Sequence, residues 1–276
     1  MNFKRDIITL LAIVIILTVG IIYALKVAPG SFTMQNVPLG QRQDMGVSFV
    51  CTAENTDYVF AHILLAFVDM PECDGYRPIP DVSWFIMESG ETLYVDSSGI
   101  ARSKMFTNIP DRPELYNQHF SVRVFVIADD NGIFQPAIVP YYFIETPPLA
   151  NPPVPPDGEL GIAPSVIEMN LNNSTGSFII FNNDSISHSY EIIVRTPVLN
   201  SRKLPDLSPG FSTVLDTSRF NISPAKVKLK PNSRKKISLR WLNIAEEKSL
   251  SEALIFITAD NGIKNFIRVK LTIDEK

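Results

Sequence analysis

The stretch NISPAKVKLKPNSRKKISL, residues 221–239, decides the fold class of this 276-residue chain. On both sides of the Pro-Asn-Ser sequence at residues 231–233, apolar residues alternate with polar or basic ones. A period of two is typical of a β-strand that buries one face, and Pro and Asn favour a turn. The stretch therefore predicts two strands that form a hairpin.

The same alternation recurs in both halves of the chain. Short runs of β-branched and aromatic residues are separated by Asn, Asp, Gly and Pro, at spacings of about 10–15 residues that suit an antiparallel sandwich. The clearest runs are residues 47–51, 121–126, 177–181, 191–194 and 266–271. Together with 21 prolines, they predict an all-β chain. One candidate helix, AEEKSLSEAL, spans residues 245–254.

A proline-rich segment divides the chain. Six of the twelve residues in TPPLANPPVPPD, residues 146–157, are proline. Such a segment favours the extended polyproline II conformation and forms a semi-rigid spacer. We therefore expect two domains of ordinary size, at residues 28–146 and 158–276, with a linker at residues 147–157.

The two predicted domains show the same order of sequence features. The first closes with ADDNGI at residues 128–133, and the second closes with ADNGI at residues 259–263. A duplicated module would explain this order. The alternative is that two unrelated sandwiches each use an Asn-Gly hairpin, because Asn and Gly supply the positive φ values that a tight turn needs.

An apolar segment near the N-terminus predicts a membrane anchor. Residues 7–25 are uncharged and almost wholly apolar. A helix of this length spans about 28 Å, close to the hydrocarbon thickness of a bilayer. We assign a transmembrane anchor to residues 7–27, with residues 1–6 in the cytoplasm, although a cleaved signal peptide is the alternative.

The charges beside this segment suggest its orientation. Lys4 and Arg5 precede it and only Lys26 follows it, which favours an N-terminus inside. The predicted location is therefore a cytoplasmic or inner membrane crossed once, with the bulk of the chain extracytoplasmic or periplasmic. A reversed topology, with the domains in the cytoplasm, stays open.

Residues 221–239 resemble the strand–turn–strand of the immunoglobulin-like domain shared by periplasmic pilus chaperones and major sperm proteins. The shared pattern is a hydrophobic-x-Pro, a strand, a Pro-x-Ser turn and a second strand. The first domain resembles generic immunoglobulin-like repeats of envelope-exposed prokaryotic proteins, in PDVSW at residues 80–84 and PDRPE at residues 110–114. The resemblance implies two immunoglobulin-like antiparallel β-sandwiches in tandem after an N-terminal transmembrane helix.

Charge is divided unevenly between the predicted domains. Residues 28–157 hold 6 basic and 16 acidic residues, whereas residues 158–276 hold 16 basic and 12 acidic ones. An acidic first domain of net charge −10 therefore precedes a basic second domain of net charge +4. With residues 1–27 included, the whole chain carries −4, which argues against nucleic-acid binding.

The basic charge is concentrated in residues 226–240, which contain no acid. Alternation would turn Lys226, Lys228, Lys230, Lys236 and Arg240 outward over an apolar inner face. They form either a solvated strand face that protects a sheet edge or a docking surface for an anionic partner. That partner could be an acidic protein face, another copy of the chain, an anionic envelope polymer or lipid headgroups. The predicted partner-binding residues are Lys226, Lys228, Lys230, Arg234, Lys235, Lys236 and Arg240.

Signals of chemistry are weak. The chain has no nucleotide-binding glycine pattern and no Gly-x-Ser-x-Gly elbow, and its three histidines, His62, His119 and His188, are scattered. We therefore expect no catalytic, cofactor or metal site and no small-molecule substrate. Cys51 and Cys73 are the only cysteines, and an extracytoplasmic location would permit a disulfide between them.

These features predict a membrane-anchored, envelope-exposed structural or adaptor protein rather than an enzyme. It would act by protein–protein contacts within a membrane-associated assembly, with other envelope or membrane proteins or with itself. One alternative is a module that binds an anionic envelope polymer or a lipid surface through the basic hairpin. Another, implied by the resemblance, is a secretion or pilus-type chaperone.

Overall fold

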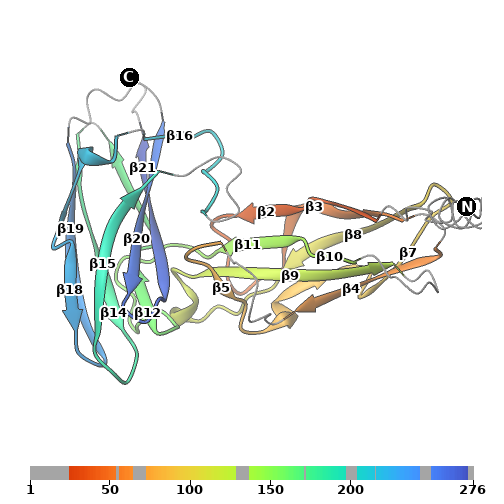
Figure 1. Cartoon of the computed structure of the whole chain (residues 1–276), viewed down its shortest axis with the longest axis horizontal. Coiled ribbons are helices and arrows are strands. Elements are labelled where there is room, and N and C mark those ends of the chain that lie inside the picture. The colour runs from red at the N-terminus through yellow and green to blue at the C-terminus, as the bar shows by residue number, and fades with distance from the viewer. Residues whose placement is uncertain are drawn as a thin grey trace, which may run out of the picture.

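A computed structural model of the chain describes residues 25–53, 56–64, 73–128, 137–170, 172–196, 204–214, 216–242 and 250–272. Within these ranges the regular structure consists of β-strands and three short 3₁₀ helices, without an α-helix (Figure 1). The all-β prediction is confirmed for this part of the chain.

The first half forms two facing sheets, which we call the N-terminal sandwich. Their strand orders are β1-β3-β8-β6 and β2-β11-β9-β4-β7, and β5 and β10 also pair with β9. The first sheet contains β1 (Lys26–Ala28), β3 (Gln43–Thr52), β6 (Phe85–Met87) and β8 (Ile100–Thr107). The second contains β2 (Ser31–Met34), β4 (Tyr58–Leu64), β5 (Arg77–Pro78), β7 (Thr92–Tyr94), β9 (His119–Ala128), β10 (Ala137–Ile138) and β11 (Tyr141–Glu145). The 3₁₀ helices here are η1 (Val82–Trp84) and η2 (Pro113–Leu115).

The second half forms the C-terminal sandwich. Its strand orders are β12-β14-β19-β17 and β13-β21-β20-β15-β18, and β16 also pairs with β20. The four-stranded sheet contains β12 (Leu160–Ala163), β14 (Thr175–Asn182), β17 (Phe220–Ser223) and β19 (Ser233–Trp241). The six-stranded sheet contains β13 (Val166–Asn170), β15 (His188–Arg195), β16 (Ser212–Thr213), β18 (Lys226–Leu229), β20 (Ser251–Ala259) and β21 (Lys264–Thr272). The helix η3 (Thr217–Arg219) precedes β17.

The two sandwiches have the same topology. In each, the first strand pairs antiparallel in the four-stranded sheet, and the next strand, after an Ala-Pro sequence, pairs parallel with the last strand of the other sheet. Proline has no N–H, so the ladder ends where the chain changes sheets. The strand orders match the A-B-E-D and G-F-C sheets of an immunoglobulin-like sandwich. One shared topology is what a duplicated module predicts.

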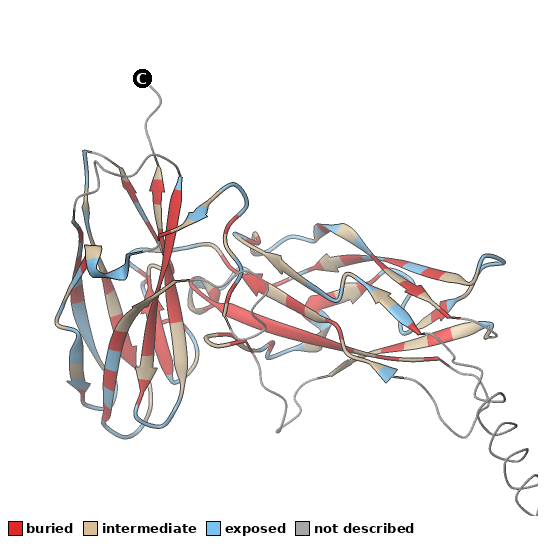
Figure 2. Ribbon diagram, turned by 45° about the horizontal axis from the view of Figure 1, so that its top comes forward, coloured by how far each residue is buried: buried red, intermediate tan, exposed pale blue. Residues whose placement is uncertain are grey.

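Each sandwich has its own apolar core, built from the inward-facing residues of its strands (Figure 2). Phe49, Phe120 and Tyr142 lie in the N-terminal core. Phe178, Ile237 and Trp241 lie in the C-terminal core. The alternation found in the sequence therefore separates core from surface in both halves.

A third apolar cluster joins the sandwiches. Cys73 and Tyr76 from the first half pack with Leu254, Phe256 and Phe266 from the second. The C-terminal sandwich therefore lies across one end of the N-terminal sandwich (Figure 1). Lys26 pairs with Thr52 at the opposite end, so the described chain enters the molecule far from this contact.

Part of the predicted anchor is wrong. Leu25 is buried in the N-terminal core, and Lys26 and Val27 lie in β1, where they pair with Thr52 and Cys51 of β3, so the anchor does not include residues 25–27. Residues 1–24 lie outside the described ranges. Within those ranges, the chain has no helix with the length and apolar character needed to cross a bilayer.

The candidate helix at residues 245–254 is also wrong over its last residues, 251–254. Residues 251–254 begin β20, and residues 245–249 lie outside the described ranges. β20 is buried on both faces, because its inner face covers the core and its outer face meets the N-terminal sandwich. Its apolar run therefore lacks the alternation that marks a half-buried strand.

The basic stretch at residues 226–240 does not form a hairpin. β18 pairs with β15 in the six-stranded sheet, whereas β19 pairs with β14 and β17 in the four-stranded sheet. The turn predicted at residues 231–233 is present, with Asn232 at a φ of 51°, but it carries the chain from one sheet to the other. Both arrangements have the same alternation, so the sequence pattern does not distinguish them.

Candidate functional site

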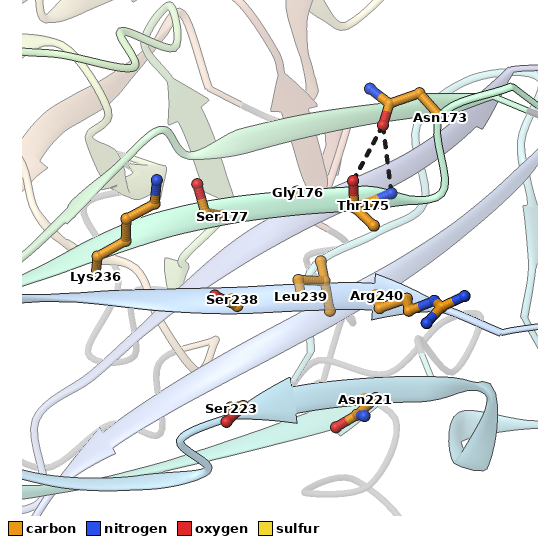
Figure 3. Close-up of a pocket in the computed structure, with 10 residues that line it drawn as sticks. All are labelled: Asn173, Thr175, Gly176, Ser177, Asn221, Ser223, Lys236, Ser238, Leu239 and Arg240. Carbon is orange, nitrogen blue, oxygen red and sulfur yellow. Dashed lines mark hydrogen bonds between the residues drawn. The ribbon is translucent and has the colours of Figure 1, made fainter.

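The best candidate for a binding site is the outer face of β14, β19 and β17, on the four-stranded sheet of the C-terminal sandwich (Figure 3). We call it the polar face. Its side chains are short hydroxyl or amide groups with two cations among them. They are Asn173, Thr175, Ser177, Asn221, Ser223, Lys236, Ser238 and Arg240.

Strand register arranges these side chains in rows. Ser238 of β19 lies between Ser177 of β14 and Ser223 of β17, so one row consists of three hydroxyl groups. In the next row of outward-facing residues, Arg240 of β19 lies between Thr175 of β14 and Asn221 of β17. Because residues two apart on a strand share a face, Lys236 follows Ser238 on the other side of the serine row.

The polar face is hollowed and lacks negative charge. The hollow has a volume of about 580 Å³, and no acidic residue lines it. Within the described ranges, neither Lys236 nor Arg240 forms an ion pair. At its edge, the Asn173 side-chain oxygen accepts hydrogen bonds of 3.4 and 3.3 Å from the Thr175 N–H and hydroxyl. Cationic and hydrogen-bonding groups are therefore available to a ligand.

The predicted partner-binding residues do not form one patch. All seven are exposed, but only Lys236 and Arg240 lie on the polar face. Arg234 and Lys235 lie near the start of the same strand. Lys226 and Lys228 lie on β18 in the other sheet, and the Lys226 ammonium is 2.9 Å from the Glu191 carboxylate. Lys230 lies in the connection between the two sheets. The crossing of the chain at residues 230–232 is the reason for this separation.

The contact between the sandwiches, which we call the joint, centres on a buried arginine. Arg268 of β21 is fully buried, and its guanidinium forms two hydrogen bonds, of 2.7 and 2.5 Å, to the Glu145 carboxylate of the N-terminal sandwich. It also donates to Glu252 of its own sandwich at 2.9 Å. The Tyr76 hydroxyl donates to Glu145 at 2.5 Å. Bidentate pairing of this kind fixes orientation as well as distance.

The charge of Arg268 lowers the pKa of the buried Glu145 carboxyl. Burial by itself raises the pKa of Glu145, but the adjacent Arg268 charge and its hydrogen bonds outweigh burial and hold the pKa below its ordinary value. His119 stacks on Phe266 at 3.8 Å, and burial lowers the pKa of His119 to about 4, so it is neutral. Sequence reasoning missed the joint. The available signals were Arg268 within the apolar run FIRV and Glu145 at the end of YYFIE.

The proline-rich segment between the sandwiches makes polar contacts with both of them. The Arg77 guanidinium is 2.8 Å from the Asp157 carboxylate, and Asn117 exchanges two hydrogen bonds with the backbone of Leu149. On the other side, the Asn183 amide donates to the carbonyls of Pro156 and Gly158. The proline-rich segment is therefore held against the protein.

His188 lies between two carboxylates at one end of the C-terminal sandwich. Its Nδ1 is 2.6 Å from Asp260, and its Nε2 is 2.8 Å from Asp184. Hydrogen bonds to both carboxylates raise the pKa of His188, because only the imidazolium can donate from both nitrogens. His188 ties β15 to the β20–β21 turn, which is a structural arrangement. The described ranges hold no cluster of His, Cys, Asp and Glu arranged to bind a metal.

The possible disulfide between Cys51 and Cys73 is not formed, because the two thiols lie in different clusters. Cys51 is buried in the N-terminal core, while Cys73 is buried in the joint, and both are free. Inward-facing Cys51 pairs with Ala101 of β8, whereas Cys73 precedes Tyr76 at the opposite end of the sandwich. Burial raises the pKa of Cys51 to about 11 and that of Cys73 to about 12.

No protein-family model matches this chain, and no curated protein does. Several solved structures are similar at low identity. One is the periplasmic chaperone SfaE, at 10% identity and a TM-score of 0.31, covering 42% of this chain and 60% of that chain. Another is WR4, a major sperm protein family member from C. elegans, at 11% identity and a TM-score of 0.28, covering 42% of this chain and 99% of that one.

A third similar structure is a protein of unknown function from Porphyromonas gingivalis W83. It is 11% identical with a TM-score of 0.33, and the alignment covers 90% of this chain and 98% of that one. The chain spans 54–60% of the length of the first chaperone-structure chains that it matches.

Proposed function

We propose that this chain is a membrane-anchored, envelope-exposed adaptor that acts by protein–protein contacts within a membrane-associated assembly, without catalysis. The joint is the observation that carries the proposal. Buried, bidentate Arg268 and the surrounding aromatic cluster hold the two sandwiches in one orientation. A body of fixed shape positions bound partners relative to each other, which is what an adaptor needs.

The path of the chain supports this role. The described chain enters the N-terminal sandwich at β1, which pairs with the last residues of β3, and β3 runs away from the C-terminal sandwich (Figure 1). An anchor within residues 7–24, with the N-terminus in the cytoplasm, would leave the N-terminal sandwich next to the outer side of the membrane. The C-terminal sandwich would then be held away from the bilayer, where partners reach it.

The test is purification of the full-length protein from its membrane in mild detergent at low and moderate salt. We expect a membrane or envelope protein to accompany it in fixed stoichiometry at both salt concentrations. The double variant Glu145→Ala/Arg268→Ala, which releases the joint, should lose that partner while staying in the membrane fraction. A wild-type protein that purifies alone at both concentrations would contradict the adaptor function.

The proposed location is tested separately. Protease added outside the cytoplasmic membrane should digest the two sandwiches, and removal of residues 1–24 should release the protein from membranes. Sandwiches that are cut only after the membrane is opened would overturn the orientation.

A further inference from the structure

We propose that the polar face binds an acidic polysaccharide, a chain of sugar units that carry carboxylate groups. This binding function goes beyond the adaptor role, which rests on the joint. The polar face lies on the four-stranded sheet, whereas the outer side of β20 and β21 in the other sheet faces the N-terminal sandwich. It is therefore on the side of the C-terminal sandwich turned away from the rest of the molecule (Figure 1).

Charge favours an extended anion. Lys236 and Arg240 are four residues apart on β19, a distance of about 13 Å in an extended strand. Neither has an anionic partner within the described ranges, and no acid lines the hollow, so their fields add rather than cancel. A small anion reaches one of these cations at a time, while a polymer with repeated carboxylates reaches both.

The neutral groups between the cations match sugar hydroxyls. The serine row of Ser177, Ser238 and Ser223 lies between Lys236 and Arg240 (Figure 3). Each hydroxyl both donates and accepts hydrogen bonds, as sugar hydroxyls do. Because these side chains are short, ordering them costs less conformational entropy than ordering long ones.

The absence of aromatic side chains argues for a hydrophilic polymer instead of a protein. The buried centre of a protein–protein interface is rich in aromatic and apolar side chains. None of the residues that line the hollow is aromatic, and its one large apolar residue, Leu239, points into the core. The polar face therefore lacks the anchor that a protein partner needs.

Calorimetric titration of the purified protein with polygalacturonate tests the proposal, with neutral dextran and polyglutamate as comparison polymers. We expect polygalacturonate to bind at low salt and dextran not to bind. The variant Lys236→Gln/Arg240→Gln should weaken binding at least about tenfold, since it removes both cations from the polar face. Ser177→Val/Ser238→Val should weaken binding severalfold with the charge unchanged.

The matched control is Lys226→Gln/Lys228→Gln, which removes the same charge from the other sheet. It should change the affinity less than about twofold. Equal losses in the two charge variants, or no binding of polygalacturonate by the wild type, would overturn the proposal. Tighter binding of polyglutamate would also overturn it in favour of an acidic protein partner. Circular dichroism melts establish that each variant is folded.

Discussion

Arg268 and Arg240 lie on strands of the same sandwich and have opposite environments. Arg268 is fully buried, and its guanidinium meets two carboxylates and the Asp206 carbonyl. Arg240 is exposed, and within the described ranges its guanidinium forms no ion pair. The joint uses its arginine to hold two parts of the molecule together, whereas the polar face keeps its arginine available. Replacement of Arg268 and replacement of Arg240 should therefore change the free energy of unfolding by very different amounts.

The largest expected effect comes from Arg268→Ala. The substitution removes the cation that both buried carboxylates, Glu145 and Glu252, contact, at a cost of about 3–5 kcal/mol. Urea unfolding followed by tryptophan fluorescence measures the change. The double variant Arg268→Met/Glu145→Leu removes charge from both sides and should recover part of the loss. A loss below about 1 kcal/mol for Arg268→Ala would show that the joint does not depend on this pair.

A smaller effect is expected from Gly75→Ala, which tests the packing of the joint. Gly75 has a φ of 89°, and an added Cβ would lie 2.4 Å from the Phe266 ring. Backbone strain and displacement of this ring should cost about 1–3 kcal/mol. Gly210→Ala is the control, because Gly210 also has a positive φ, of 84°, but no heavy atom within 4 Å of an added Cβ. Equal losses in the two variants would attribute the effect to the backbone alone.

His188 tests whether a charged group away from the joint also stabilises the fold. Its pKa is raised above the ordinary 6.5 by hydrogen bonds to Asp184 and Asp260. The stability that it contributes is fully present below pH 6.5 and lost as the pH rises through the folded-state pKa. The hydrogen bonds from His188 lower the pKa of both carboxyls, so their contribution is lost at acidic pH.

Thermal melts of the wild type and His188→Gln between pH 5 and 9 measure this effect. The difference in melting temperature should be largest near pH 5–6 and should shrink as the pH rises. A difference that does not change with pH would show that His188 acts by packing rather than by charge.

The smallest expected effect comes from Arg240→Ala. Because Arg240 is exposed and has no ion pair within the described ranges, the free energy of unfolding should change by less than about 0.5 kcal/mol. The same urea unfolding experiment measures it. A loss comparable to that of Arg268→Ala would remove the distinction between the joint and the polar face.

Strand content and the direction of side chains were predictable from sequence. The alternation at residues 226–240 correctly turned Leu229, Ile237 and Leu239 inward. It also correctly left Lys226, Lys228, Lys230, Lys236 and Arg240 exposed. The predicted hairpin was wrong, because the partner of a strand depends on how all the strands of the sandwich pack and not on its own residue pattern. The helix predicted at residues 245–254 was wrong over residues 251–254, because β20 is covered on both faces and therefore lacks the alternation of a half-buried strand.

The sequence by itself determined the all-β class, since a period of two lets a strand bury one face in a core. Tertiary structure alone decided which strands lie side by side, and thereby which polar groups meet. Ser177, Ser223 and Ser238 come from three separate strands, and register brings them into one row. Glu145 and Arg268 are 123 residues apart and meet in the joint. Such contacts depend on the packing of distant strands, so no local pattern of residues encodes them.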